Sequence, residues 1–174
     1  NDFFESNSIY DKIKAVPASI KAILCSQIAS IYIDIIYAKK QLEMDYNDDL
    51  LSQLKYADKA INHEMEEKIE GNGICYLYNL KAKGLIIQEK FKEAKKIINI
   101  SLNNPKNNKD SKITSFYRLS AIYSYLNEHE KSNYYSKKAL ELTFLNNPNQ
   151  RTLFNRILNT AAIHFVNENY LKSF

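Results

Sequence analysis

The residue types that most often carry chemistry in proteins are few in this chain, and their spacing does not suit a reaction. The three histidines, His63, His129 and His164, lack the spacing of metal ligands. The segment HEMEE at 63–67 begins like the zinc motif HExxH but has no second histidine to complete the pair on one helix face. The sequence also contains no phosphate-binding glycine loop, dinucleotide fingerprint or nucleophile elbow. The sequence therefore predicts that the chain is not an enzyme and uses no metal or cofactor.

The two cysteines, Cys25 and Cys75, are far apart and form no CxxC pair. Both lie in apolar helical stretches, which favours buried free thiols, while a single disulfide between them stays an open alternative. Lysines cluster at 90–96 among Glu89 and Glu93, a pattern typical of a solvated helix face.

Composition favours long helices. Of the 174 residues, 45% are hydrophobic and 25% are charged, a profile typical of one soluble globular domain. Glycine and proline number only three each, whereas an all-β protein would need many more tight turns. The net charge of +4 is smaller than a dedicated nucleic-acid-binding domain usually shows, so we do not expect nucleic acid as the partner.

The most apolar stretch, SIKAILCSQIASIYIDIIYA, is interrupted by Lys21, Gln27 and Asp34, which predicts a core helix and no membrane insertion. The sequence has no initiator methionine, and we expect it to be part of a larger protein. For its compartment, the cytoplasm is favoured and an extracytoplasmic sensor domain is the alternative.

Apolar periodicity and breaker residues predict helices along almost the whole chain. Asn47 or Asp48 is the expected cap of the second helix, and Asp110 or Ser111 that of the fifth. The expected helices are 18–44, 49–69, 74–88, 91–103, 112–126, 130–145 and 150–166.

The helices also repeat. The segments QEKFKEAKK, NEHEKSNYYSKKA and NENYLKS can be aligned, with Phe91, His129 and Tyr170 in one column at spacings of 38 and 41 residues. A fixed period of helix pairs is typical of proteins built from stacked repeats.

In this pattern the chain resembles the tetratricopeptide repeat family, whose unit has about 34 residues. The resemblance covers roughly 20–174 and is strongest over 76–142, and the longer spacing indicates longer helices, as in bacterial regulatory and sensor proteins. The matching residues are Tyr78, Ala82, Leu85, Phe91, Ala94 and Ser101 in one repeat, and Phe116, Leu119, Ser120, Tyr123, Ser132 and Ala139 in the next. Lys81 and His129 depart from the family pattern.

The resemblance implies an all-α fold: a right-handed superhelical solenoid of antiparallel helix pairs forming one domain over 1–174. The expected repeats are 18–70, 72–105, 110–148 and a truncated 149–174.

In such a solenoid the first helix of each pair lines a concave groove, and polar residues on those helices are the candidate ligand contacts. Asparagine can donate to and accept from a peptide backbone at once, and Lys83 and Arg118 could take a carboxylate. The candidates are Tyr76, Asn79, Lys83, Tyr117, Arg118, Ser124, Asn155 and Asn159.

Two functions follow as hypotheses. The first is a non-catalytic module that binds a protein or peptide segment in its groove, as the sensing or scaffolding region of a bacterial transcription regulator or signalling protein. The second is a structural module that forms homo-oligomers through an uncovered C-terminal helix face, including Ile157, Ala161 and Phe165.

Overall fold

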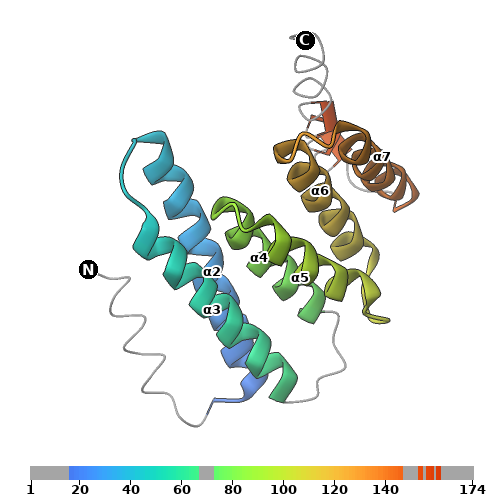
Figure 1. The fold of residues 1–174 in the computed structure, drawn as a ribbon. Coiled ribbons are helices and arrows are strands. Elements are labelled where there is room, and N and C mark those ends of the chain that lie inside the picture. The colour runs from blue at the N-terminus through green and yellow to red at the C-terminus, as the bar shows by residue number, and fades with distance from the viewer. Residues whose placement is uncertain (1–15, 67–72, 147–152, 155, 159, 162–174) are drawn as a thin grey trace.

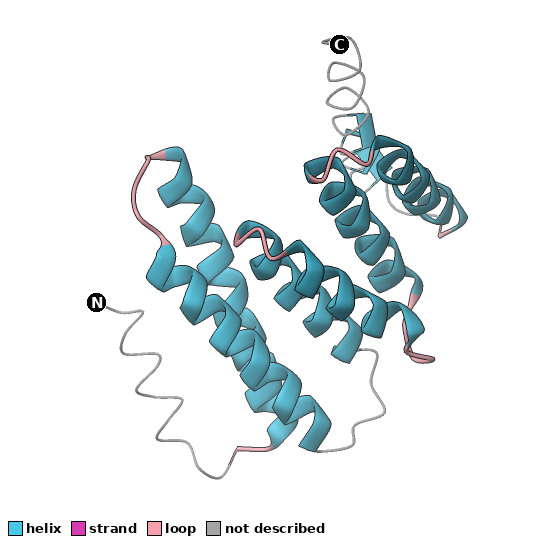
Figure 2. Cartoon of the chain, in the orientation of Figure 1, coloured by secondary structure: helices cyan, strands magenta, loops and turns pink. Residues whose placement is uncertain are grey.

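The computed structural model describes residues 16–66, 73–146, 153–154, 156–158 and 160–161. Within these residues the chain is helical and has no strand, which confirms the predicted all-α class (Figures 1 and 2). The helices are α2 (Ala18–Gln41), α3 (Asn47–Glu66), α4 (Gly73–Ile87), α5 (Phe91–Asn103), α6 (Lys109–Tyr125) and α7 (His129–Leu145). The described parts of 153–161 are also helical.

The helices pack as consecutive pairs: α2 with α3, α4 with α5, and α6 with α7. Each pair touches the next through α3 and α4 or through α5 and α6. The first helices also meet directly, because α4 contacts both α2 and α6 (Figure 1). These three helices therefore form a row that could line one continuous surface.

The turn inside each pair has the same geometry. Glu43, Glu89 and Asn127 have φ values of 54°, 59° and 58°, in the left-handed region that often ends helices. In each turn the next residue donates its N–H to the carbonyl five positions back, and the left-handed residue donates to the carbonyl three back. The turn residues lie 46 and 38 residues apart. One backbone motif thus closes all three hairpins.

Helix starts differ from the expected caps. The N-cap of α6 is Asn108, whose side chain accepts a hydrogen bond from the Ser111 N–H at 2.8 Å, and not Asp110 or Ser111. At the start of α3, Asp45 Oδ1 accepts from the backbone N–H of Asn47 at 3.1 Å. Short polar side chains cluster at both places, so several of them could satisfy the free N–H groups and the sequence alone does not select one.

Small residues bring the helices of a pair together. Ala82, Ser120 and Ala139 are fully buried, as their small size predicts for positions where backbones approach closely. Ser120 Oγ donates to the Ser132 carbonyl at 2.8 Å, and Ser132 Oγ donates to the Ser120 carbonyl at 2.9 Å. This reciprocal pair ties α6 to α7 while leaving both hydroxyl groups satisfied.

Both cysteines are buried and no disulfide joins them, so the disulfide alternative is not realised. Burial raises the pKa of the Cys75 thiol, whose Sγ lies 3.8 Å from the Ser101 carbonyl. Each thiol therefore behaves as a small core side chain.

Helix α2 is long and apolar enough, by length and composition, to cross a membrane. A core helix of a soluble protein passes the same test, and here the buried side of α2 packs along α3. Tyr32 of α2 and Tyr56 of α3 stack with ring centroids 6.1 Å apart. In this fold the side of α2 that faces α3 is part of the core, while Ile20, Ile23 and Ile31 are exposed.

Candidate functional site

A groove of about 590 Å³ runs across the row formed by α2, α4 and α6. Its walls come from all three helices, from the turn after α4, from the first residue of α5 and from Arg156. The lining residues are Ile36, Tyr37, Lys40, Lys83, Ile86, Ile87, Glu89, Phe91, Thr114, Tyr117, Arg118, Ala121, Tyr125 and Arg156. Three of the eight predicted site residues, Lys83, Tyr117 and Arg118, are among them.

One part of the groove is apolar and aromatic. Phe91, at the start of α5, stacks on Tyr125, at the end of α6, with centroids 5.5 Å apart and planes at 16°. Tyr125 remains 65% exposed, and Ile86 and Ile87 of α4 line the same groove. An apolar side chain of a ligand could be buried against these residues.

A second part carries positive charge. Lys83 of α4 and Arg118 of α6 are both half-buried. The Lys83 ammonium lies 4.8 Å from the centre of the Tyr37 ring, which contributes a cation–π interaction. Burial, and then the charge of Arg118, lower the pKa of Lys83; burial also lowers the pKa of Arg118, to about 10. The positive charge of Arg118 therefore disfavours the protonated form of Lys83.

The groove is closed at one side by Tyr117 and Arg156. The Tyr117 hydroxyl donates to the Arg156 carbonyl at 3.0 Å and lies 3.2 Å from Thr160 Oγ1. Arg156 in turn donates to Asp110 Oδ1 at 3.1 Å. Because its charge is paired with Asp110, Arg156 serves as part of the wall.

Tyr76 and Ser124 are not among the residues that line the groove. The Tyr76 side chain is 49% exposed, and its hydroxyl is 3.3 Å from Ser30 Oγ, so it links α4 to α2. Ser124 is half-buried on α6. Asn155 and Asn159 lie outside the described residues.

Asn79 differs from the expectation, because it is buried between helices. Its side chain is 1% exposed and uses its whole amide within the fold. Nδ2 donates to the carbonyls of Cys75 and Ser111, at 3.0 and 3.1 Å, and Oδ1 accepts from Ser115 Oγ at 3.1 Å. Asn79 therefore joins α4 to α6 and offers nothing to a ligand.

Sequence reasoning missed the contribution of α2 to the groove. The helix pairs can be aligned on their left-handed turn residues. The residues six positions before these turns are Tyr37, Lys83 and Ala121. All three line the groove, one from each of the three first helices. An alignment of the three helix pairs on these turns would therefore have placed Tyr37 of α2 in the groove.

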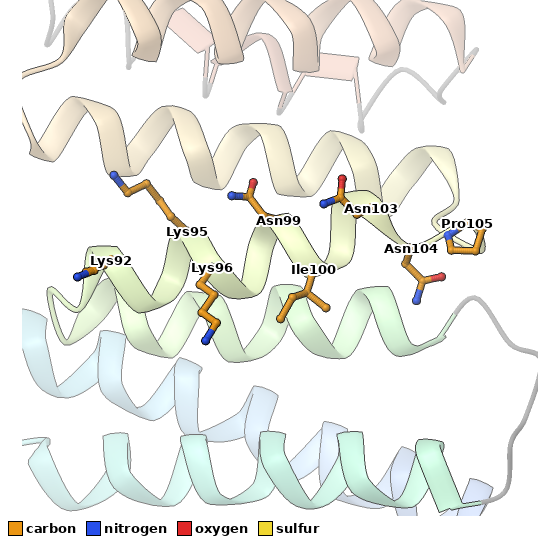
Figure 3. A pocket seen from close by; sticks show the side chains of 8 residues that line it. All are labelled: Lys92, Lys95, Lys96, Asn99, Ile100, Asn103, Asn104 and Pro105. Atoms are coloured by element: carbon orange, nitrogen blue, oxygen red, sulfur yellow. The ribbon is translucent and has the colours of Figure 1, made fainter.

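A larger but more open hollow, of about 700 Å³, lies along the outer face of α5 (Figure 3). Its lining residues are Lys92, Lys95, Lys96, Asn99, Ile100, Asn103, Asn104 and Pro105. They all come from α5 and the turn after it (Figure 3). One of them, Lys95, also contacts α6, because its ammonium lies 5.1 Å from the centre of the Tyr123 ring. This surface matches the solvated lysine face that the sequence predicts.

Among the described residues, no group of three or more histidine, cysteine, aspartate or glutamate side chains is placed to hold a metal ion. Comparison of the chain with protein-family models and with curated proteins finds no match. The site itself therefore carries the functional argument.

Proposed function

We propose that the chain is a non-catalytic repeat module, similar to the tetratricopeptide repeat family, that binds a protein or peptide segment in the groove across α2, α4 and α6. The observation that carries the proposal is the groove, which combines an apolar part with convergent polar groups from three successive helix pairs. In this proposal the pairs continue as a right-handed solenoid, and the chain forms one domain over 1–174.

The repeated turns support the repeat assignment. The same two hydrogen bonds close each hairpin around Glu43, Glu89 and Asn127. Fully buried small residues lie seven positions before two of these turns, at Ala82 and Ser120. Such equivalent positions are expected when one supersecondary unit is stacked several times.

A ligand in this groove would touch three helices that belong to three different pairs. Binding would then favour the relative placement of the pairs that fits the ligand best, at the expense of other placements. A sensing or scaffolding region of a bacterial regulator or signalling protein would use this population shift to pass on the binding event.

The test is selection of short random peptides displayed on phage, followed by affinity measurements with labelled peptides. Ala121, half-buried on the α6 wall of the groove, is replaced by tryptophan to fill the site. Lys137→Trp, at an exposed position of α7, is the matched control. We expect enriched peptides to bind wild type and Lys137→Trp equally and to lose binding to Ala121→Trp. Equal binding to Ala121→Trp, or no enrichment, would refute the proposal.

Self-assembly is a second candidate function, favoured by exposed apolar residues near the C-terminal end of the described chain. Phe144, Phe154 and Leu158 are 56%, 60% and 50% exposed, and Ile157 is 41% exposed. Ala161 is exposed too, while Phe165 lies outside the described residues. Light scattering coupled to size-exclusion chromatography distinguishes the candidates: a concentration-dependent dimer supports assembly, and a monomer at all concentrations excludes it.

A further inference from the structure

Two cations that line the groove, Lys83 and Arg118, have no carboxylate partner among the described residues. Five ion pairs join described residues elsewhere in the fold, and none of them includes Lys83 or Arg118. Neither residue has a hydrogen bond to another described residue, and the buried Arg118 Nε likewise has no hydrogen-bond partner within the described part of the chain. Asp34 attracts Lys83 only at longer range, and among the described residues Glu89 is the one acidic residue that lines the groove.

This arrangement is unfavourable without a ligand. Two partly desolvated cations repel each other and have given up part of their hydration, and a buried N–H without an acceptor adds to that cost. The lowered pKa of Lys83, caused by burial and by Arg118, has the same physical origin. Arrangements that disfavour the free protein in this way occur where binding supplies the missing partner.

The side chains present suit a carboxylate. An arginine guanidinium presents its donors as a planar fork that matches the two oxygens of a carboxylate, and no hydrogen bond within the described residues holds the Arg118 fork in place. Lys83 supplies a further point charge, positioned by its contact with the Tyr37 ring. The apolar part, at Phe91 and Tyr125, belongs to the same groove.

We propose that the ligand is an acidic peptide segment, in which the carboxylate of an aspartate or glutamate side chain binds between Lys83 and Arg118 while a neighbouring apolar side chain packs on Phe91 and Tyr125. This inference rests on the proposed function and adds the chemistry of the ligand to it. Arg156 does not take part, because its charge is already paired with Asp110.

The test uses peptides selected against the wild-type chain, each synthesised a second time with its acidic residues replaced by the matching amides. Because a hydrogen bond to a charged group contributes about 1.5–3 kcal/mol, we expect the amide versions to bind wild type about tenfold more weakly or worse. This comparison needs no protein variant, so it is independent of any folding defect. Equal affinity of the acidic and amide versions would overturn the inference.

Protein variants locate the contact. Arg118→Met and Lys83→Met should each weaken the acidic peptides about tenfold, and should change the affinity of the amide versions far less. Lys96→Met, on the outer face of α5, removes the same charge elsewhere and should leave both affinities unchanged. Weakening by Lys96→Met equal to that by Arg118→Met would show a nonspecific charge effect and overturn the inference.

The two proposals fail separately. Peptides that lose binding to Ala121→Trp but bind equally well as amides would keep the groove as the site and remove the acidic preference. Peptides that bind Ala121→Trp normally would remove both.

Discussion

Replacing Asn79 with alanine is expected to lower the free energy of unfolding by about 2–4 kcal/mol, since the change removes three buried hydrogen bonds and leaves partners unsatisfied. The Asn79 amide bonds the Ser111 carbonyl and the Ser115 hydroxyl of α6, and it also bonds the Cys75 carbonyl of its own helix, α4. In the alanine variant Ser115 Oγ loses its acceptor at a position with no exposure to water. Urea denaturation followed by far-ultraviolet circular dichroism measures the effect.

Two controls make the Asn79 result specific. Asn99→Ala changes an exposed asparagine in the middle of α5 and should alter stability by less than about 0.5 kcal/mol or raise it slightly, because alanine is the better helix former. Ser115→Ala should cost less in the Asn79→Ala background than in wild type, since the bond between them is already gone. A loss for Asn79→Ala no larger than that for Asn99→Ala would contradict the structural role.

Replacing Gly84 with valine is expected to destabilise the fold by about 2–3 kcal/mol through overpacking. A Cβ atom added at Gly84 would lie 1.9 Å from Gln53 Oε1 and 3.0 Å from Leu54 Cδ2, both on α3. Gln53 is fully buried and its Nε2 donates to the Leu80 carbonyl at 3.2 Å, so its side chain has little room to move away. Glycine at this position therefore lets α3 and α4 approach each other closely.

Gly73→Val is the matched control, because the atoms nearest to its added Cβ belong to the end of the Glu64 side chain, which is not fully buried and can move. We expect Gly73→Val to cost less than about 1 kcal/mol, as usual for surface changes. Adding Gln53→Ala to Gly84→Val should recover part of the lost stability, because it removes the closest clash. A Gly84→Val protein as stable as wild type, or a double variant with no recovery, would contradict this packing account.

The helices were predictable because their signals are local and strong. Scarce glycine, apolar periodicity and polar breaks predict a helix over 91–103, and α5 has the same bounds. The helix predicted over 130–145 differs from α7, His129–Leu145, by one residue. The helix termini were less predictable, because neighbouring polar side chains compete for the same free N–H groups, as at Asn108 and Asp110.

The faces of the helices were harder to predict than the helices themselves. One residue along a helix corresponds to a rotation of about 100°, so a small error of register moves a side chain from the groove into the interior. The position along the helix matters as well: Asn79 and Lys83 are four residues apart on one side of α4, yet Asn79 is buried against Ser111 and Ser115 of α6, whereas Lys83 lines the groove as expected. The contribution of α2, with Tyr37, was missed because the alignment of groove-lining positions did not include the first helix pair. Aligning the pairs on their left-handed turns would have included it.

The central claim is that the ligand site is the groove across α2, α4 and α6. Titrating the isotope-labelled chain with a selected acidic peptide, and following its backbone amides by two-dimensional NMR, tests this claim most directly. We predict that the largest shifts occur at the groove residues Tyr37, Lys83, Arg118, Ala121 and Tyr125. Shifts that cluster instead on the outer face of α5, along Lys92–Pro105, would contradict it.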